Sequence, residues 1–139
     1  MVWNYTYDEM LERVYSQLPV SSKEEVRFEL PQIKSVLSGN KTVVSNLPQL
    51  ASTFRRSVEH LLKFMLRELA TTGEQKGSEF VFVGKFRQEF LQDKINKYAK
   101  EFVLCHQCGK PDTNLLKEAA TTFLICEACG ARESLRTLK

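Results

Sequence analysis

Four cysteines near the C-terminus are the residues best suited to chemistry in this chain. They occur as two matching Cys-x-x-Cys-Gly motifs, Cys105 with Cys108 and Cys126 with Cys129, and seventeen residues separate the two pairs. This spacing is typical of a metal site with four thiolate ligands. The glycine after each pair allows the backbone to fold beneath the sulfur atoms with a positive φ, so that amide groups point at the thiolates.

Four thiolates predict a closed tetrahedral site for one structural Zn2+ ion, because no coordination position is left for water or substrate. Iron in a rubredoxin-like site is the alternative, since tetrahedral thiolates accept either metal. We favour zinc because the basic segment before the motifs gives no reason for redox chemistry. His106 lies between two of the cysteines, but four thiolates suffice, and we expect it at the surface of the loop.

No other combination of residues indicates catalysis. The chain has no Walker loop, no Gly-x-Ser-x-Gly and no His-Glu-x-x-His motif, and His60 has no nucleophile near it in sequence. We therefore expect a protein that is not an enzyme. The adjacent Arg55 and Arg56 are candidates for contact with RNA phosphates, although a solvated helix face is the more common role of such a pair.

The composition is ordinary for a globular protein, with a weakly basic centre. Of 139 residues, 42% are hydrophobic and 27% are charged, and the net charge is +3. Residues 21–100 hold fourteen Lys and Arg against nine Asp and Glu, an excess that allows proximity to RNA without requiring it. No apolar run reaches the roughly 20 residues that cross a bilayer, so no membrane partner is expected. All four cysteines belong to the metal motifs, which favours a reducing cytoplasm.

Residues 1–22 predict one amphipathic helix. Thr6-x-x-Glu9 is a capping-box signature, and Pro19 ends the helix. The apolar stripe of this helix consists of Tyr7, Met10, Leu11, Val14 and Leu18. Such a stripe either packs on its own domain or docks on another protein, and the periodicity alone does not decide between the two. Residues 20–29 are mostly polar and charged and read as a linker.

Residues 23–100 predict a small α/β core domain with a mixed sheet. Strands are expected at residues 33–37 and 41–44, around a turn at Gly39 and Asn40, and at residues 80–83. The polar segment 71–78 looks like a hairpin loop.

Helices are expected to alternate with these strands. One should begin at Asn46, paired with Gln49 in a capping arrangement and with Pro48 in its first turn. Another should follow Gly84, with Phe86, Phe90, Ile95 and Tyr98 on one face. Residues 60–70 fit either a half-buried strand or a helix, because alternating Leu62, Phe64 and Leu66 are set among good helix formers.

Residues 101–139 predict a zinc ribbon, in which strands at residues 102–104, 114–116 and 123–125 accompany the two cysteine motifs. So short a segment cannot bury enough surface to fold alone, and the metal should supply much of its stability. The predicted fold is therefore α+β in three parts: an N-terminal helix, an α/β core and a C-terminal zinc ribbon.

Over essentially its whole length the chain resembles the beta subunits of archaeal translation initiation factor 2, and more distantly the amino-terminal region of eukaryotic initiation factor 5. The most specific stretches are residues 7–19 (YDEMLERVYSQLP), 66–70 (LRELA), 83–86 (VGKF) and 102–105 (FVLC), together with the remaining cysteines. The eukaryotic beta subunit carries lysine-rich blocks in a long N-terminal extension, and the factors which those blocks recruit are not expected as partners here.

The resemblance implies a non-catalytic subunit of a heterotrimer. In this family the gamma subunit binds GTP and, with the alpha subunit, delivers initiator methionyl-tRNA to the small ribosomal subunit. The N-terminal helix docks on gamma, which makes Tyr7, Met10, Leu11, Val14 and Leu18 the interface candidates. The resemblance also favours a strand for residues 60–70, paired with residues 79–83. The alternative, from the ribbon and the basic centre alone, is a free-standing zinc-ribbon protein that binds nucleic acid.

Overall fold

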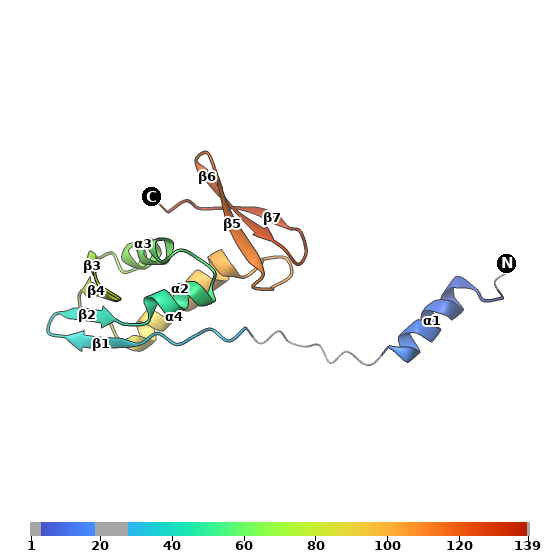
Figure 1. The fold of residues 1–139 in the computed structure, drawn as a ribbon, viewed down its shortest axis with the longest axis horizontal. Helices are drawn as coiled ribbons and strands as arrows, with labels where there is room; N and C mark the ends of the chain where they lie inside the picture. Colours follow the sequence, from blue (N-terminus) through green and yellow to red (C-terminus); the bar gives the residue numbers. More distant parts are fainter. Residues whose placement is uncertain (1–3, 19–27, 139) are drawn as a thin grey trace.

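A computed structural model describes residues 4–18 and 28–138 of the chain, which form a helix, an α+β core and a small ribbon (Figure 1). The elements are, in order, α1 (Tyr7–Gln17), β1 (Ser35–Ser38), β2 (Lys41–Val44), α2 (Leu47–Thr53), α3 (Val58–Glu68), β3 (Gly73–Lys76), β4 (Glu79–Val83), α4 (Gln88–Tyr98), the π-helical turn η1 (Ala99–Val103), β5 (Thr113–Glu118), β6 (Thr121–Cys126) and β7 (Arg132–Leu135). The predicted α+β class with a C-terminal four-cysteine ribbon is confirmed. The predicted linker, residues 20–29, lies mostly outside the described residues.

Four strands form the core sheet in the order β1-β2-β4-β3. The β1–β2 hairpin turns at Gly39 and Asn40 as expected, and Gly39 has a φ of 61° that favours glycine. All three strand pairs are antiparallel, so the expected mixed sheet is wrong. The reason is the connection: α2 and α3 carry the chain to the edge strand β3, and the hairpin turn at Gly77 then places β4 between β3 and β2.

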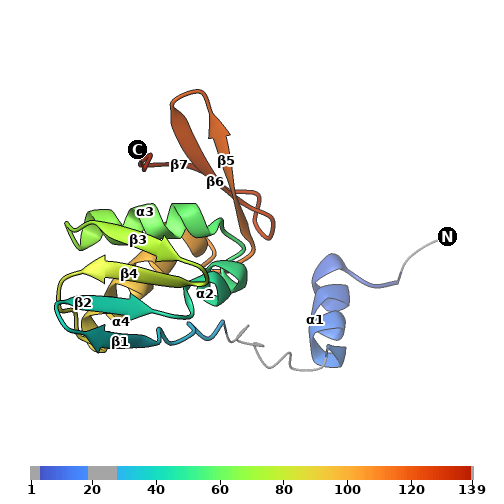
Figure 2. The same ribbon diagram turned by 60° about the vertical axis from the view of Figure 1, so that its left-hand side comes forward.

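One hydrophobic core joins the sheet to the helices. Figure 2 shows the sheet nearly face-on, with α4 crossing behind it. The sheet contributes Val44, Phe80 and Phe82, and the largest fully buried side chains from the helical segments are Phe54, Phe64, Tyr98 and Phe102. The rings of Phe64 and Tyr98 meet edge to face with centroids 5.1 Å apart, an arrangement that aromatic pairs prefer.

Residues 60–70 form most of helix α3 and not the predicted strand. The side chain of Ser57 caps the helix by accepting a hydrogen bond from the His60 amide, 3.3 Å away. Leu61, Phe64 and Met65 lie on one buried face at helical spacing. The alternating Leu62, Phe64 and Leu66 belong to this helix: Phe64 is on its buried face, and Leu62 and Leu66 lie partly buried beside that face. The strand that pairs with β4 in place of the predicted one is β3, which lies in the segment predicted as a hairpin loop, while β2 pairs with the other side of β4.

Two further expectations for the helices need correction. In α4 the buried face consists of Leu91, Ile95 and Tyr98, whereas Phe90 is 44% exposed and stacks on Phe86 ahead of the helix. Asn46 does begin α2, and Pro48 is in its first turn, but the Asn46 side chain does not cap it.

The buried side chain of Asn46 instead fixes the segment that precedes β1. Its Oδ1 accepts from the Lys34 amide and its Nδ2 donates to the Gln32 carbonyl, each at 2.8 Å. These two bonds satisfy an amide that would otherwise cost free energy on burial.

The ribbon follows the core without a break in the helix. α4 continues into η1, and the predicted boundary between residues 100 and 101 lies inside this helical segment, so Phe102 and Val103 belong to the core. The strand expected at residues 102–104 is thus wrong. The strands β5 and β6 occur where the sequence placed them, and β7, which the sequence analysis missed, completes the antiparallel sheet.

The C-terminal segment ties the ribbon back to the core. Leu135 and Leu138 pack against the core, and between them Arg136 bonds to Glu101 and, at 3.2 Å, to Glu68. The Glu68 carboxylate also accepts from Lys94 and Lys97 at 3.4 and 2.8 Å, and its side chain is only 12% exposed. Three cations from two different segments therefore converge on one nearly buried carboxylate.

Glu68→Gln should lower the free energy of unfolding at pH 7 by about 2 kcal/mol, because charge-assisted hydrogen bonds are lost at a site with little solvent screening. The hydrogen bond with Lys97, reinforced by Arg136 and Lys94 against the effect of burial, lowers the pKa of Glu68 from 4.5 to about 2. The unfolded chain therefore binds the proton first. The stability difference between wild type and variant should shrink as the pH falls from 4.5 towards 2.

Urea unfolding at pH 7, 4 and 3 measures this difference. Glu118→Gln is the matched control, because the Glu118–Arg132 pair is about half exposed at both ends and should contribute about 0.5 kcal/mol. A Glu68 effect that is no larger than the Glu118 effect, or that is constant with pH, would contradict the assignment.

Candidate metal centre and binding surfaces

The two cysteine motifs fold as two copies of one loop. Cys105 accepts at its carbonyl from Gly109, and Cys126 accepts from Gly130, at 2.9 and 3.0 Å. Both glycines have the left-handed φ that the sequence analysis expected, 71° and 74°. A side chain with a Cβ would be strained there, so the glycines allow each loop to turn beneath its own sulfur atoms.

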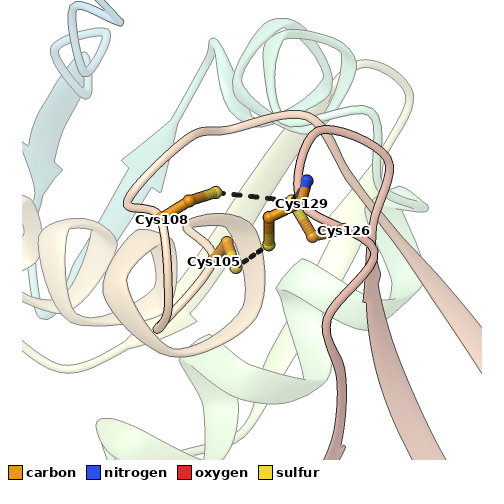
Figure 3. A group of neighbouring side chains, drawn as sticks. All are labelled: Cys105, Cys108, Cys126 and Cys129. Carbon is orange, nitrogen blue, oxygen red and sulfur yellow. Dashed lines mark hydrogen bonds between the residues drawn. The ribbon is translucent and has the colours of Figure 1, made fainter. Parts of the chain in front are cut away.

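The four sulfur atoms converge on one point (Figure 3). The Sγ atoms of Cys105 and Cys129 are 3.6 Å apart, those of Cys108 and Cys126 are 3.5 Å apart, and all four ligand atoms lie within 4.8 Å of one another. A metal–sulfur bond of about 2.3 Å in a tetrahedron places sulfurs roughly 3.8 Å apart. Disulfide sulfurs would be at about 2.05 Å. The donor set thus fits one tetrahedral metal ion.

Backbone amides around the sulfurs affect which thiols ionise. The amides of Cys108 and Gln107 lower the pKa of Cys105 to about 6, and the amides of Cys129 and Ala128 lower the pKa of Cys126. This is the amide-to-thiolate pattern that the sequence predicted.

The second cysteine of each motif behaves differently. Backbone bonding with Ala131 would by itself lower the pKa of Cys129, but burial and the neighbouring sulfurs outweigh it and raise the pKa to about 12. Backbone bonding with Lys110 acts to lower the pKa of Cys108, but burial and the sulfurs of Cys126 and Cys105 outweigh it and raise the pKa. Four thiolates together therefore require a cation, and metal binding will release protons.

His106 is directed away from the sulfurs. Its Nδ1 lies 2.7 Å from the Glu133 carboxylate and its Nε2 lies 3.0 Å from the Lys100 carbonyl. Although burial acts against it, bonding with Glu133 and Lys100 raises the pKa of His106. The imidazole therefore joins the first cysteine loop to β7 and to the end of the core, and the cluster of possible metal ligands consists of the four cysteines.

Arg56 joins the ribbon to the core. Its Nε and Nη2 donate to the Phe102 carbonyl at 3.2 and 2.9 Å, and its Nη1 donates to the Thr113 carbonyl at 2.9 Å. Nη2 also donates to Thr113 Oγ1 at 2.7 Å, and Nη1 to the Arg55 carbonyl at 3.1 Å. These bonds use all five N–H groups of the guanidinium. Thr113 Oγ1 in turn donates to the Val103 carbonyl.

The two arginines that the sequence singled out for RNA therefore differ. All five guanidinium donors of Arg56 are engaged within the chain, which leaves none free for a phosphate. Arg55 is exposed, and its role in RNA contact stays a prediction. The sequence could not distinguish them, because the partners of Arg56 lie 46 and 57 residues further along the chain.

His60 is partly buried at the edge of the core. Its Nδ1 lies 2.9 Å from the Tyr98 hydroxyl, and its ring meets Phe102 edge to face at 5.0 Å. Burial, with the charges of Arg56 and Lys63, lowers the pKa of His60, so the ring is neutral at pH 7.

Helix α1 presents its predicted stripe to solvent. Figures 1 and 2 show α1 apart from the core, and none of its side chains is buried. Tyr7, Val14 and Leu18 are 72%, 53% and 53% exposed, and Met10 and Leu11 are each 39% exposed. Among the described residues, the stripe is thus not packed on its own domain.

The capping box of α1 is present as predicted. Thr6 donates from its amide to the Glu9 carboxylate at 2.8 Å, and the Glu9 amide donates to Thr6 Oγ1.

No helix in residues 4–18 or 28–138 has the length and apolar character that a membrane span requires.

An antiparallel α+β core that carries a four-cysteine ribbon with the donor set of a metal site, together with an exposed amphipathic helix, defines the class of small three-part proteins to which the chain belongs. A family model, described as a domain found in initiation factors 2B and 5, matches residues 19–132. Proteins named translation initiation factor 2 subunit beta are similar over nearly the whole chain. The relative from Methanococcus vannielii is 41% identical over 99% of this chain and all of its own, and the one from Methanopyrus kandleri is 42% identical over 97% and 98%.

A third such relative, from Methanosphaera stadtmanae, is 39% identical over 95% of this chain and 93% of its own. The chain therefore belongs to the family of archaeal translation initiation factor 2 beta subunits. The resemblance that the sequence motifs indicated is confirmed.

Reduced protein should contain one metal ion per chain, and Cys126→Ser should remove it and unfold the ribbon. The reason is that the ribbon buries few apolar side chains of its own, chiefly Leu124, and depends on the tetrahedral centre. Elemental analysis gives the stoichiometry, and amide hydrogen exchange of β5, β6 and β7 gives the local unfolding.

Gln107→Ala is the matched control, because it changes an exposed side chain between Cys105 and Cys108 that lies outside the ligand set. It should keep the full metal content. Metal loss in this variant, or a metal-free reduced wild type, would refute the four-cysteine assignment.

Arg56→Lys should lower the free energy of unfolding by about 2–3 kcal/mol, because an ammonium group cannot reach two carbonyls and a hydroxyl at once. Arg55→Lys, one residue away and exposed, should change it by less than about 0.5 kcal/mol. Urea titrations of the metal-loaded proteins compare the two. Equal stability of both variants would show that the Arg56 bonds do not hold the ribbon to the core.

Proposed function

We propose that this chain is the non-catalytic beta subunit of an archaeal translation initiation factor 2, bound directly to the GTPase gamma subunit through α1. The observation that carries the proposal is the solvent-exposed stripe of Tyr7, Met10, Leu11, Val14 and Leu18 on a helix that stands apart from the core. Membership of the beta-subunit family supports it, since a beta subunit by name works with other subunits. The alternative, a free-standing nucleic-acid binder, does not account for an apolar stripe that is exposed to solvent.

The energetics indicate how such docking would work. Burying five side chains of this size yields about 10 kcal/mol gross, while association costs about 4–15 kcal/mol. The stripe alone therefore supports only weak binding. Tyr5 and Tyr15, which are 54% and 69% exposed, are available to enlarge the interface.

In this proposal the four cysteines hold one Zn2+ ion, which is structural. Bound there, the ion would supply coordination bonds that join the two cysteine loops to each other. The surrounding residues position it: the amides beside Cys105 and Cys126 favour their thiolates, and His106 joins its loop to Glu133. With four protein ligands, no position remains for a substrate.

The core and ribbon would extend the reach of the complex towards RNA in the cytoplasm. Together with the alpha and gamma subunits, the chain would assist delivery of initiator methionyl-tRNA to the small ribosomal subunit, without a chemical step of its own. The basic character of residues 21–100 and the exposed Arg55 support this orientation.

Leu11→Asp and Val14→Asp should each weaken capture of the gamma subunit at least about 100-fold, because a carboxylate would be buried without a partner. Both side chains are exposed in this chain, so the melting temperature of the variants should match that of wild type. The measurement is binding of purified gamma to the immobilised full chain.

Ser16→Asp is the matched control, since it places the same charge on the opposite face of α1 and should leave binding unchanged. If both stripe variants bind gamma as well as Ser16→Asp does, α1 is not the docking element.

Elemental analysis that finds iron in place of zinc would overturn the choice of ion but not the docking.

A further inference from the structure

A cleft of about 460 Å³, lined mainly by polar and basic residues, lies between the core and the ribbon. The end of α2 and the start of α3 form one wall with Arg55, Ser57 and His60, and β5 forms the other with Asn114, Leu115 and Lys117. This volume is within the range of pockets that hold small ligands or a nucleotide unit.

The charges on the walls have one sign. Arg55 and Lys117 are both exposed, and within the described parts of the chain neither takes part in an ion pair. None of the residues that line the cleft is acidic. One carboxylate touches a wall residue, because Glu127 accepts from Asn114 Nδ2. Two uncompensated cations on opposite walls favour an anion between them.

The neutral groups of the cleft are hydrogen-bond donors and acceptors. Ser57 Oγ accepts from the His60 amide, so its own proton is free to be donated. Leu115 is the one aliphatic side chain among the residues that line the cleft, so a helical peptide would find no row of apolar pockets for its i, i+3 and i+4 side chains. Phosphate oxygens and a ribose hydroxyl match these groups better.

Arg56 fixes the distance between the walls. It follows Arg55 directly and bonds to Thr113, which precedes Asn114 on the opposite wall. The two cationic side chains therefore project from a junction that is held by charge-assisted hydrogen bonds, and the site does not have to be assembled on binding.

We propose that this cleft binds the phosphodiester backbone of single-stranded RNA, with Arg55 and Lys117 contacting phosphate from opposite sides. The proposal rests on the proposed function for the choice of RNA, and on the cleft for the choice of residues. It adds a ribbon residue, Lys117, to Arg55, which is one of the two arginines that the sequence had indicated.

Arg55 has a backbone conformation that glycine adopts more easily, so a glycine substitution there can separate binding from stability. α2 ends in a Schellman motif, in which the Arg56 amide bonds to the Ala51 carbonyl and the Arg55 amide to the Ser52 carbonyl. Arg55 occupies the left-handed position, with a φ of 53°, where glycine is usual. Arg55→Gly should therefore raise the melting temperature while it weakens RNA binding, an outcome that general misfolding cannot produce.

Ala70 supplies the matched control. It holds the same left-handed position at the end of α3, with a φ of 48°, far from the cleft walls. Ala70→Gly should raise the melting temperature and leave RNA binding unchanged. Lys76→Gln, on the edge strand β3, is the control for Lys117→Gln, since it removes one exposed positive charge elsewhere.

The experiment measures fluorescence anisotropy of a labelled single-stranded RNA with the metal-loaded full chain at several salt concentrations. Arg55→Gly and Lys117→Gln should each weaken binding about three- to fivefold. Each should also reduce the slope of log K against log salt by about 0.7. Binding by both variants at the level of Ala70→Gly and Lys76→Gln would overturn the proposal.

Two competitors separate the alternatives. Displacement of the RNA by adenosine monophosphate at equal phosphate concentration would assign the cleft to free nucleotides, and displacement by an acidic peptide would assign it to a protein partner; either overturns the RNA assignment. Capture of gamma by Arg55→Gly should be unchanged. Loss of RNA binding in wild type with gamma capture intact would reject this inference alone, whereas failure of gamma capture would reject the proposed function.

Discussion

The guanidinium of Arg56 lies where α2, η1 and β5 meet, and the arrangement of the ribbon on the core depends on it. Its donors satisfy the Phe102 and Thr113 carbonyls, which belong to the last turn of the core and the first strand of the ribbon. Partial burial lowers the pKa of Arg56, yet a guanidinium stays charged at any pH at which the protein is folded. The contact is therefore permanent in charge, unlike one made by histidine or lysine. Arg136, which follows β7 at the other edge of the ribbon sheet, also joins the ribbon to the core, through Glu68 and Glu101.

These two contacts explain how a ribbon with little core of its own is held in place. Leu124 and the first cysteine of each loop are its buried apolar side chains, and their burial cannot balance the entropy lost by about thirty ordered residues. A metal ion held by the four cysteines would close the ribbon at one end, and the arginines join the ribbon to the larger core at its base. The ribbon would thus rely on metal ligation, hydrogen bonds and ion pairs, whereas the core is stabilised by packing around Phe64, Tyr98 and Phe102.

The extent to which the sequence predicted the structure follows from how local each signal is. The cysteine loops, the Gly39 hairpin and the Thr6–Glu9 capping box depend on residues a few positions apart, and all three were predicted correctly. Residues 60–70 fitted two periodicities, and only the cap at Ser57 and the packing of Leu61 and Met65 select the helix. The bonds of Arg56 join residues 46 and 57 positions apart, and nothing in the local sequence distinguishes Arg56 from Arg55.

The isolation of α1 has a consequence for how the two halves of the molecule would act together. A helix of 11 residues is marginal in water even with good propensity, since nucleation is costly. The capping box and the acidic first turn with Asp8 and Glu9 offset part of that cost, and bonding with Thr6 lowers the pKa of Glu9. A partner groove that buries the stripe would supply the remainder, so folding of α1 and docking would be one coupled event. The core and ribbon have their own packing and arginine contacts and do not depend on that event, so the RNA binding proposed for the cleft would not require α1 to be engaged.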